Sequence, residues 1–403
     1  MRGETTHRLG VSALTAVLIA TALGGSRASV SSGPGPIARC DGADAIDFAC
    51  YQRRYREMVA VRGPRPAIRD LNEHALRSGY VRAACHQLMH GIGRDSGRTL
   101  GLRAFDRGDE TCSSGFFHGV VEAVMARIGS GRVVAQAERV CAPFRARGAH
   151  GIANYNCVHG MGHGFMDVFS GDVFRALDGC AALPDSWERH HCEGGVFMEN
   201  LTSMSQPARR AHHLRPEQPL YPCTAVAARY KHECYMKQTA YALFVRDNDF
   251  QAVFRMCAAS PDVGFRDDCE QGLGGDASIR ASKYVTDPAA RRSTVRALCG
   301  LGRDRAARRN CVIGAVTGIV RDGASHAANP GALCASFAEA DLRGACARAH
   351  LETVRQLTSE PAPRQDPVDT GGHSPELLCR NAARIEAASA RAPIPQDDRG
   401  GLQ

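Results

Sequence analysis

Lysine is scarce in this 403-residue chain: only three of its 50 basic residues are lysines, and aromatic residues make up 6% of the sequence. The net charge of +8 is therefore carried almost wholly by arginines, which are spread along the chain and not interleaved with aromatic side chains. Surfaces that bind nucleic acid usually combine clustered basic residues with aromatic side chains on which bases stack. We therefore expect no nucleic-acid partner.

Motifs of several common enzyme classes are also missing. The chain has no G-x-S-x-G elbow, no P-loop, no H-E-x-x-H zinc-protease helix and no C-x-x-C-H haem attachment motif. Runs that alternate apolar and polar residues, as β-strands do, are nearly absent. The sequence therefore predicts an all-α protein outside these enzyme classes.

One apolar segment lies near the N-terminus. Arg2 and Arg8 flank the start of an apolar run over residues 9–25, and Ser26-Arg27-Ala28 fits a cleavage site with small residues. We predict that residues 1–28 form a signal peptide, with a retained N-terminal anchor as the alternative. Because no second run is long and apolar enough to cross a bilayer, we expect a secreted or extracytoplasmic protein (periplasm or cell surface). Stable membrane insertion is not expected after signal cleavage.

Cysteine, by contrast, is abundant: all 17 cysteines lie beyond the predicted signal peptide, where an oxidising compartment favours disulfides. Two series of three cysteines recur every 77 residues, and a partner cysteine precedes each by 11–16 residues. This spacing predicts six disulfides between neighbours in sequence. The predicted pairs are Cys141–Cys157, Cys180–Cys192, Cys223–Cys234, Cys257–Cys269, Cys299–Cys311 and Cys334–Cys346.

The remaining cysteines are assigned less fully. Cys40 and Cys50 are a further candidate pair, the connectivity of Cys85 and Cys112 is left open, and Cys379 is expected to be the odd thiol.

The 77-residue period predicts a repeat architecture. Successive second cysteines are separated alternately by 35 and 42 residues, and each interval is long enough for a helical hairpin. We predict disulfide-stapled helical hairpins in a curved solenoid or a closed α/α toroid. The expected segments are the signal peptide (1–28), N-terminal lead-in and helices (29–84), histidine-rich repeats (85–200), further cysteine-stapled repeats (201–357), and a Pro-rich linker with C-terminal tail (358–403).

A glycine recurs three residues after the second cysteine, as in Cys269-x-x-Gly272 and Cys311-x-x-Gly314. Glycine inside a helix costs about 0.5–1 kcal/mol relative to alanine. Its repetition at one position indicates that something approaches the backbone closely. For the later repeats we expect this to be a neighbouring helix rather than a ligand.

The early repeats place histidines at the corresponding helix starts, four residues from a second histidine or a glutamate. Residues four apart share a helix face, imidazole is the commonest metal ligand, and a carboxylate can complete such a site. The three faces that could chelate a metal are His86/His90, His118/Glu122 and His159/His163. His190 and His191, outside this pattern, are expected in an exposed polar loop.

The later repeats serve as an internal comparison. One period after His159 and His163 the chain has Met236 and Ala240, and two periods after them it has Ile313 and Thr317. Packing at these positions therefore does not require histidine. Because packed helices lie about 8–10 Å apart, the histidines of three helices converge on one site only if the row of helices curves.

Together these features predict a secreted metal-binding protein that acts as a metalloenzyme with a mononuclear or dinuclear histidine-rich centre. Copper or zinc suits such ligands best, and iron is also compatible. The reaction is open between oxidation–reduction and hydrolysis, on a small-molecule or peptide substrate. The predicted ligands are His86, His90, His118, His159, His163 and Glu122, and the predicted catalytic carboxylates are Glu122 and Glu199.

An alternative function is an extracytoplasmic helical-repeat binding scaffold in which the histidines are structural. A scaffold should spread its exposed functional residues over all repeats. The candidate residues are instead concentrated in residues 85–200, which favours the enzyme. The oligomeric state does not follow from the sequence.

Overall fold

Helices account for most of the chain that the structure describes. The computed structural model describes residues 40, 47–202, 204, 213–321 and 329–358. Within these residues there are fifteen α-helices and no strand, which confirms the all-α prediction. The predicted signal peptide, the tail beyond residue 358 and Cys379 lie outside the described residues.

The helices fall into longer and shorter ones that largely alternate along the chain. Up to residue 202 they are α1 (Phe48–Arg62), α2 (Pro64–Arg77), α3 (Gly79–Leu100), the 3₁₀ helix η1 (Gly101–Arg107), α4 (Gly115–Ile128), α5 (Val133–Arg145), α6 (Ile152–Val168), α7 (Val173–Ala181) and α8 (Ser186–Thr202). The helices after residue 202 are α9 (Ala228–Val245), α10 (Phe250–Ala258), α11 (Val263–Tyr284), α12 (Pro288–Gly300), α13 (Arg305–Arg321), α14 (Pro330–Ala335) and α15 (Ala340–Thr358).

Aspartates begin several of the shorter helices. The side chains of Asp172, Asp249 and Asp287 accept hydrogen bonds from backbone N–H groups at the starts of α7, α10 and α12. Such caps satisfy donors that have no partner inside the helix and stabilise it by about 1 kcal/mol. Each of these helices carries the first cysteine of a predicted pair near its end, so the cap helps to set where that cysteine lies.

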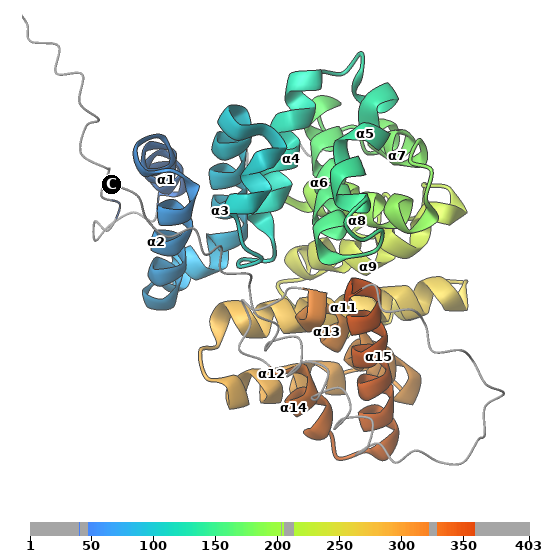
Figure 1. Ribbon diagram of the computed structural model, residues 1–403. Coiled ribbons are helices and arrows are strands. Elements are labelled where there is room, and N and C mark those ends of the chain that lie inside the picture. Colours follow the sequence, from blue (N-terminus) through green and yellow to red (C-terminus); the bar gives the residue numbers. More distant parts are fainter. Residues whose placement is uncertain (1–39, 41–46, 203, 205–212, 322–328, 359–403) are drawn as a thin grey trace, which may run out of the picture. The chain divides into compact units, whose positions relative to one another are not determined.

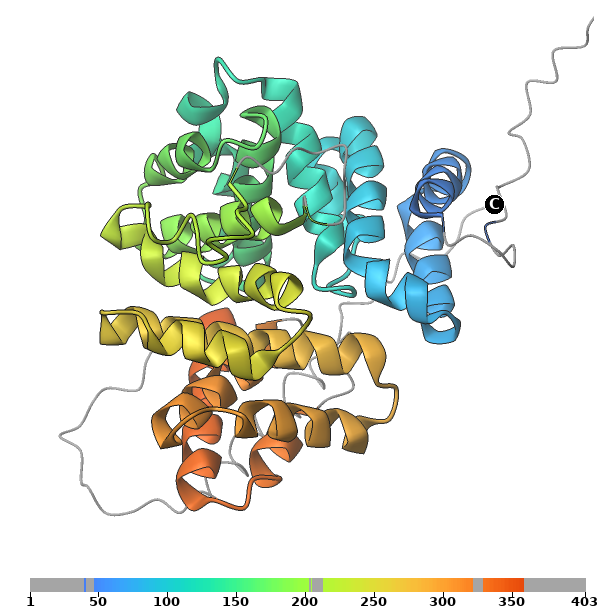
Figure 2. The same ribbon diagram turned by 180° about the vertical axis from the view of Figure 1, so that it is seen from behind.

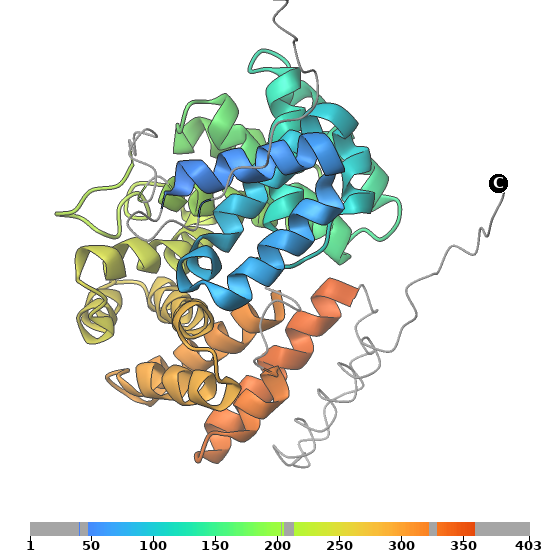
Figure 3. The same cartoon turned by 90° about the vertical axis from the view of Figure 1, so that its left-hand side faces the viewer.

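The longer helices pack in chain order. In the series α3, α4, α6, α8, α9, α11, α13 and α15, each helix contacts the next (Figures 1 and 2). Contacts of α3 with α11, and of α6 with α15, also join early members of the series to late ones. At the start of the series, α1 and α2 pack on each other and on α3 (Figure 3). A curved solenoid or closed toroid of repeats, and the predicted segment boundaries, stay predictions.

The hydrophobic core runs between these longer helices. Met89 of α3, Phe116 of α4, Met161 of α6 and Phe197 of α8 are all fully buried. Burying side chains of this size stabilises the fold by roughly 1.5–3 kcal/mol each. The core therefore fixes the mutual positions of the helices that carry the histidine pairs.

Eight disulfides join the described cysteines. They include all six pairs predicted from the period and the candidate pair Cys40–Cys50. The eighth, Cys85–Cys112, joins α3 to the segment before α4. So many disulfides fit a protein of an oxidising, extracellular-type compartment. No helix in the described part of the chain is long and apolar enough to cross a membrane.

The recurrent glycines lie where long helices touch. A Cβ atom on Gly314 of α13 would lie 1.8 Å from the carbonyl oxygen of Gln271, and one on Gly272 of α11 would lie 2.7 Å from that of Met236. Both distances are far below van der Waals contact. The expectation that neighbouring helices occupy this space in the later repeats is confirmed.

Candidate metal centre

Three successive long helices bring the predicted ligands together. His86 and His90 lie on α3, His118 and Glu122 on α4, and His159 and His163 on α6. Their ligand atoms form three triplets in which all atoms lie within 4.8 Å of one another: His86/His90/His118, His118/His159/His163 and His90/Glu122/His163. We call these six residues the buried histidine cluster.

Glycines let α4 approach α3 beside the histidines. A Cβ atom on Gly119 would lie 2.1 Å from the carbonyl oxygen of His90, and one on Gly115 would lie 2.6 Å from that of His86. His118 stands between these two glycines in sequence. Its ring centroid lies 5.3 Å from that of His90 and 5.5 Å from that of His86. Because these two positions of α4 have no side chain, the histidine rings of α3 and α4 can come into contact.

A glycine likewise allows α8 to approach α6 closely. A Cβ atom on Gly195 would lie 2.0 Å from the carbonyl oxygen of His159. One turn further along α8, Glu199 Oε2 accepts a hydrogen bond from Nδ1 of His163 over 2.8 Å. Glu199 therefore touches the cluster through His163 and orients that ring.

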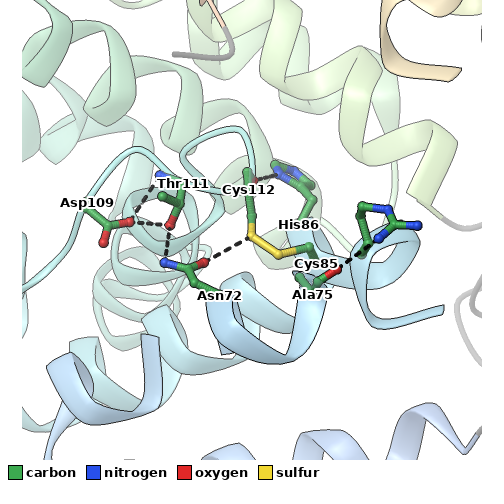
Figure 4. The surroundings of a disulfide bond; sticks show 8 residues. Asn72, Ala75, Cys85, His86, Asp109, Thr111 and Cys112 are labelled. Atoms are coloured by element: carbon green, nitrogen blue, oxygen red, sulfur yellow. Dashed lines mark hydrogen bonds between the residues drawn. A yellow bond between two sulfur atoms is a disulfide. The ribbon is translucent and has the colours of Figure 1, made fainter. Parts of the chain in front are cut away.

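A left-handed backbone turn holds the His86 ring. Cys112, Ser113 and Ser114 have φ angles of 55°, 56° and 59°, in a region that costs a non-glycine residue roughly 1–2 kcal/mol. The Cys112 carbonyl oxygen accepts a hydrogen bond from His86 Nδ1 over 2.9 Å, and the disulfide ties Cys112 to Cys85, which precedes His86 (Figure 4). Strained backbone that persists next to polar groups is typical of functional sites.

Two side chains donate hydrogen bonds to the carboxylate of Glu122. Its Oε1 accepts a hydrogen bond from His90 Nδ1 over 2.7 Å, and its Oε2 accepts one from Arg94 over 2.6 Å. Burial by itself would raise the pKa of Glu122, but His90 and Arg94 hold this pKa well below its usual range. Glu122 is thus a carboxylate that anchors His90.

Five of the six residues of the cluster are buried, His86 is half-buried, and several ring nitrogens have no partner in the part of the chain that the structure describes. His90, His118, His159 and His163 are all buried. Among the described residues, both ring nitrogens of His118 and the Nε2 atoms of His159 and His163 have no hydrogen-bond partner. Burial, followed by the neighbouring rings, holds the pKa values of His118 and His159 well below the usual histidine range. Neutral imidazoles with unshared electron pairs are the form that binds metal ions.

A second group lies nearer the surface and was missed by the sequence reasoning. His190 of α8 has its Nε2 2.8 Å from Oε1 of Glu233 on α9, and His232 Nδ1 hydrogen-bonds Asp268 over 2.7 Å. The ligand atoms of His190, His232 and Glu233 lie within 4.8 Å of one another. We call these three residues the outer histidine group.

The expected position of His190 and His191 is wrong. Both lie within α8, and His191 is buried. Polar neighbours in sequence suggested a loop, but the apolar contacts of the helix override this local signal. One signal was available: His190 and His232 each precede a second cysteine by two residues, which places them at equivalent points of adjacent helices.

Two cavities adjoin the buried histidine cluster. One, of about 340 Å³, has His86 in its wall together with residues of α2, α3 and α11. The other, of about 230 Å³, is lined by Glu122, Arg94 and Asp167 among others. The cluster is therefore enclosed but is bordered by space at two of its residues.

These features define an all-α, disulfide-rich protein with a buried histidine–carboxylate cluster. No protein-family model, no curated protein and no solved structure matches this chain.

Proposed function

We propose that this protein is an extracytoplasmic metalloenzyme whose buried histidine cluster holds two transition-metal ions, copper in the first place, and catalyses an oxidation–reduction. The observation that carries the proposal is the contact between His86 and His90. Their Nε2 atoms lie 3.0 Å apart.

The other hydrogen bonds of the two rings show that neither Nε2 atom carries a proton at this contact. His86 Nδ1 faces a backbone carbonyl and His90 Nδ1 faces a carboxylate, so both Nδ1 atoms are donors. The two Nε2 atoms of the neutral rings then face each other with unshared pairs. A shared proton would relieve the repulsion, but burial, as the largest cause, lowers the pKa values of both rings. A metal cation relieves it without protonation.

The nitrogen separation also fits a metal. Two nitrogens that bind one ion at about 2.0–2.1 Å lie roughly 2.8–3.4 Å apart for angles between square and tetrahedral. The observed 3.0 Å falls in this range. The outer hydrogen bonds of His86, His90 and His163 to Cys112, Glu122 and Glu199 are the kind that fix ligand histidines around metals.

His118 supports two ions rather than one. It belongs both to the triplet with His86 and His90 and to the triplet with His159 and His163. Both of its ring nitrogens are without hydrogen-bond partners among the described residues. A neutral imidazole has one unshared pair, so we propose that His118 releases its ring proton when the second ion binds and is shared between the two ions as an imidazolate.

The carboxylates favour redox chemistry over hydrolysis. Many metal hydrolases place a carboxylate base beside the metal-bound water. Glu122 is engaged by His90 and Arg94, its pKa is held low, and Glu199 hydrogen-bonds His163. We propose that both act as positioning residues for ligand histidines. When bound, copper would supply the one-electron steps, and the protein would supply the imidazole ligands in a mostly buried site.

Metal content tests the proposal directly. The mature chain is purified from an oxidising host, reconstituted with copper or with zinc, and assayed for bound metal by elemental analysis. We expect two ions per chain, and at most one in His118→Ala. His150→Ala, which removes a half-exposed histidine that stacks on Trp187 away from the cluster, should keep both. A chain that holds no stoichiometric metal would overturn the proposal.

Activity distinguishes the two reaction classes. Oxygen consumption is measured with ascorbate as the electron donor, and hydrolysis with p-nitrophenyl acetate and phosphate, for both metal-loaded forms. We expect oxidation by the copper form that His118→Ala abolishes. Hydrolysis by the zinc form, without oxidation by the copper form, would refute the redox assignment. Bound metal with neither activity would favour a structural role for the histidines.

A further inference from the structure

The cavity beside His86 has a basic interior. Its volume is about 340 Å³, and Arg82, Lys283 and Arg291 line it together with a single acidic residue, Glu73. Arg291 is buried, and Arg82 and Lys283 are half-buried, whereas Glu73 is exposed. The positive charges therefore lie deeper than the negative one. We call this space the basic cavity.

The hydrogen bonds of the arginines do not neutralise them. Arg82 donates to the carbonyl oxygens of Lys283 and Ala75 over 3.0 and 3.1 Å, and Arg291 donates to that of Val285 over 2.6 Å. These acceptors carry no net charge, and neither arginine forms an ion pair with another described residue. Burial and the nearby charge of Arg82 lower the pKa of Arg291, and Asp287 opposes them. Two guanidinium groups thus repel each other in a partly dry space.

The outer wall of the cavity also carries large apolar side chains. Leu76 of α2 is 81% exposed and Ile279 of α11 is 37% exposed, and both line the cavity together with the exposed Glu73. Exposed apolar side chains beside a basic interior complement a molecule with a hydrophobic body and an anionic end.

The inner wall connects the cavity to the metal centre. His86, Cys112 and Ser113 all line it. The left-handed turn and the disulfide that hold His86 therefore also shape the cavity (Figure 4).

We propose that the basic cavity binds a small carboxylate with an apolar body and places it against His86, as the substrate of the metal centre. The part of the proposal that concerns the substrate rests on the function proposed above. The binding of the carboxylate stands on the cavity alone.

Benzoate and benzamide test the charge requirement, because they have nearly the same shape and differ in charge. Each is titrated calorimetrically into the metal-free, full-length mature chain. We expect saturable one-to-one binding of benzoate and at least about tenfold weaker binding of benzamide, as for the loss of a charge-assisted hydrogen bond. Equal binding of the two, or no binding of benzoate, would overturn the proposal.

Matched variants locate the binding. Lys283→Gln and Arg291→Gln should each weaken benzoate about tenfold while changing benzamide little. Arg255→Gln removes an exposed charge on α10 outside the cavity and should change neither. Circular dichroism and thermal melting show that each variant is folded, and Lys283→Gln remains informative if loss of the buried Arg291 prevents folding. Equal weakening by Arg255→Gln would show a general charge effect and refute the site.

The link to the metal is tested on copper-loaded protein. Benzoate should shift the copper electron paramagnetic resonance or visible spectrum at concentrations that match its calorimetric affinity, and less so in Lys283→Gln. Binding to the metal-free chain without any spectral change in the copper form would overturn the substrate role. A chain that binds benzoate but holds no copper would instead refute the proposed function and leave the carboxylate site intact.

Discussion

Replacing Gly195 by alanine should dismantle the proposed metal centre through the packing of two helices. The added Cβ would lie 2.0 Å from the carbonyl oxygen of His159, where ordinary contact begins at about 3.4 Å. Helix α8 would therefore have to move away from α6 by more than about 1 Å. This movement would draw Glu199 away from His163, and metal–ligand distances in protein sites hold to about 0.2 Å. We expect Gly195→Ala to lose metal as well as stability.

The size of the effect follows from two opposing contributions. Alanine gains about 0.5–1 kcal/mol over glycine inside a helix, whereas overpacking typically costs about 1–3 kcal/mol. Gly274→Ala, whose Cβ would lie 1.9 Å from the carbonyl oxygen of Cys311, should be destabilised similarly. At the adjacent Gly275 nothing lies within 4 Å of the added atom, so Gly275→Ala should be stabilised by up to about 1 kcal/mol.

Urea denaturation followed by circular dichroism gives the stabilities, and elemental analysis gives the metal content. Gly274 lies on α11, which carries neither a predicted ligand nor, unlike α8 with Glu199, a residue that hydrogen-bonds one, so Gly274→Ala should keep its metal while losing stability. If Gly195→Ala behaves like Gly275→Ala, the close approach of α6 and α8 is not what holds the centre. If Gly274→Ala loses metal equally, the loss in Gly195→Ala reflects global destabilisation.

Two further predictions concern pH and disulfides. Burial raises the pKa of Asp276 to about 7, so between about pH 4 and 7 the folded state keeps a proton that the unfolded state has released. The free energy of unfolding should therefore fall as pH rises through this window, on the order of 2–4 kcal/mol from this residue. Urea titrations from pH 4 to 8 should show a flatter profile for Asp276→Asn; an unchanged slope would contradict the assignment. Replacing Cys85 and Cys112 by serine opens a link of 27 residues and should cost about 3.5 kcal/mol together with metal binding. Replacing Cys299 and Cys311, a separation of 12 residues, should cost about 2.8 kcal/mol but spare the metal; metal loss in both double variants would show that the first disulfide has no specific role at His86.

Most of the fold class follows from features that are local in sequence. The partners in the predicted disulfides are 11–16 residues apart, so a short helix and a turn between them leave little choice of partner. Cys85 and Cys112 could not be paired in this way, because the period does not extend to them and a 3₁₀ helix lies between them. Whether the row of helices forms a regular repeat is not decided by local spacing either.

The roles of the carboxylates could not be predicted from spacing alone. Glu122 shares a helix face with His118, yet its hydrogen bonds go to His90 and Arg94 on the preceding helix. Glu199 likewise meets His163 of another helix. The outer histidine group was missed for the same reason, since its members become neighbours only when α8 packs on α9.

The sequence by itself determined which residues can share a helix face, which cysteines can pair and where helices can approach, because helical periodicity and the missing Cβ of glycine act over a few residues. Tertiary structure alone decided that three histidine pairs meet, which ring nitrogens keep unshared pairs and which cavity borders His86. These depend on helix separation and on hydrogen bonds between segments distant in sequence.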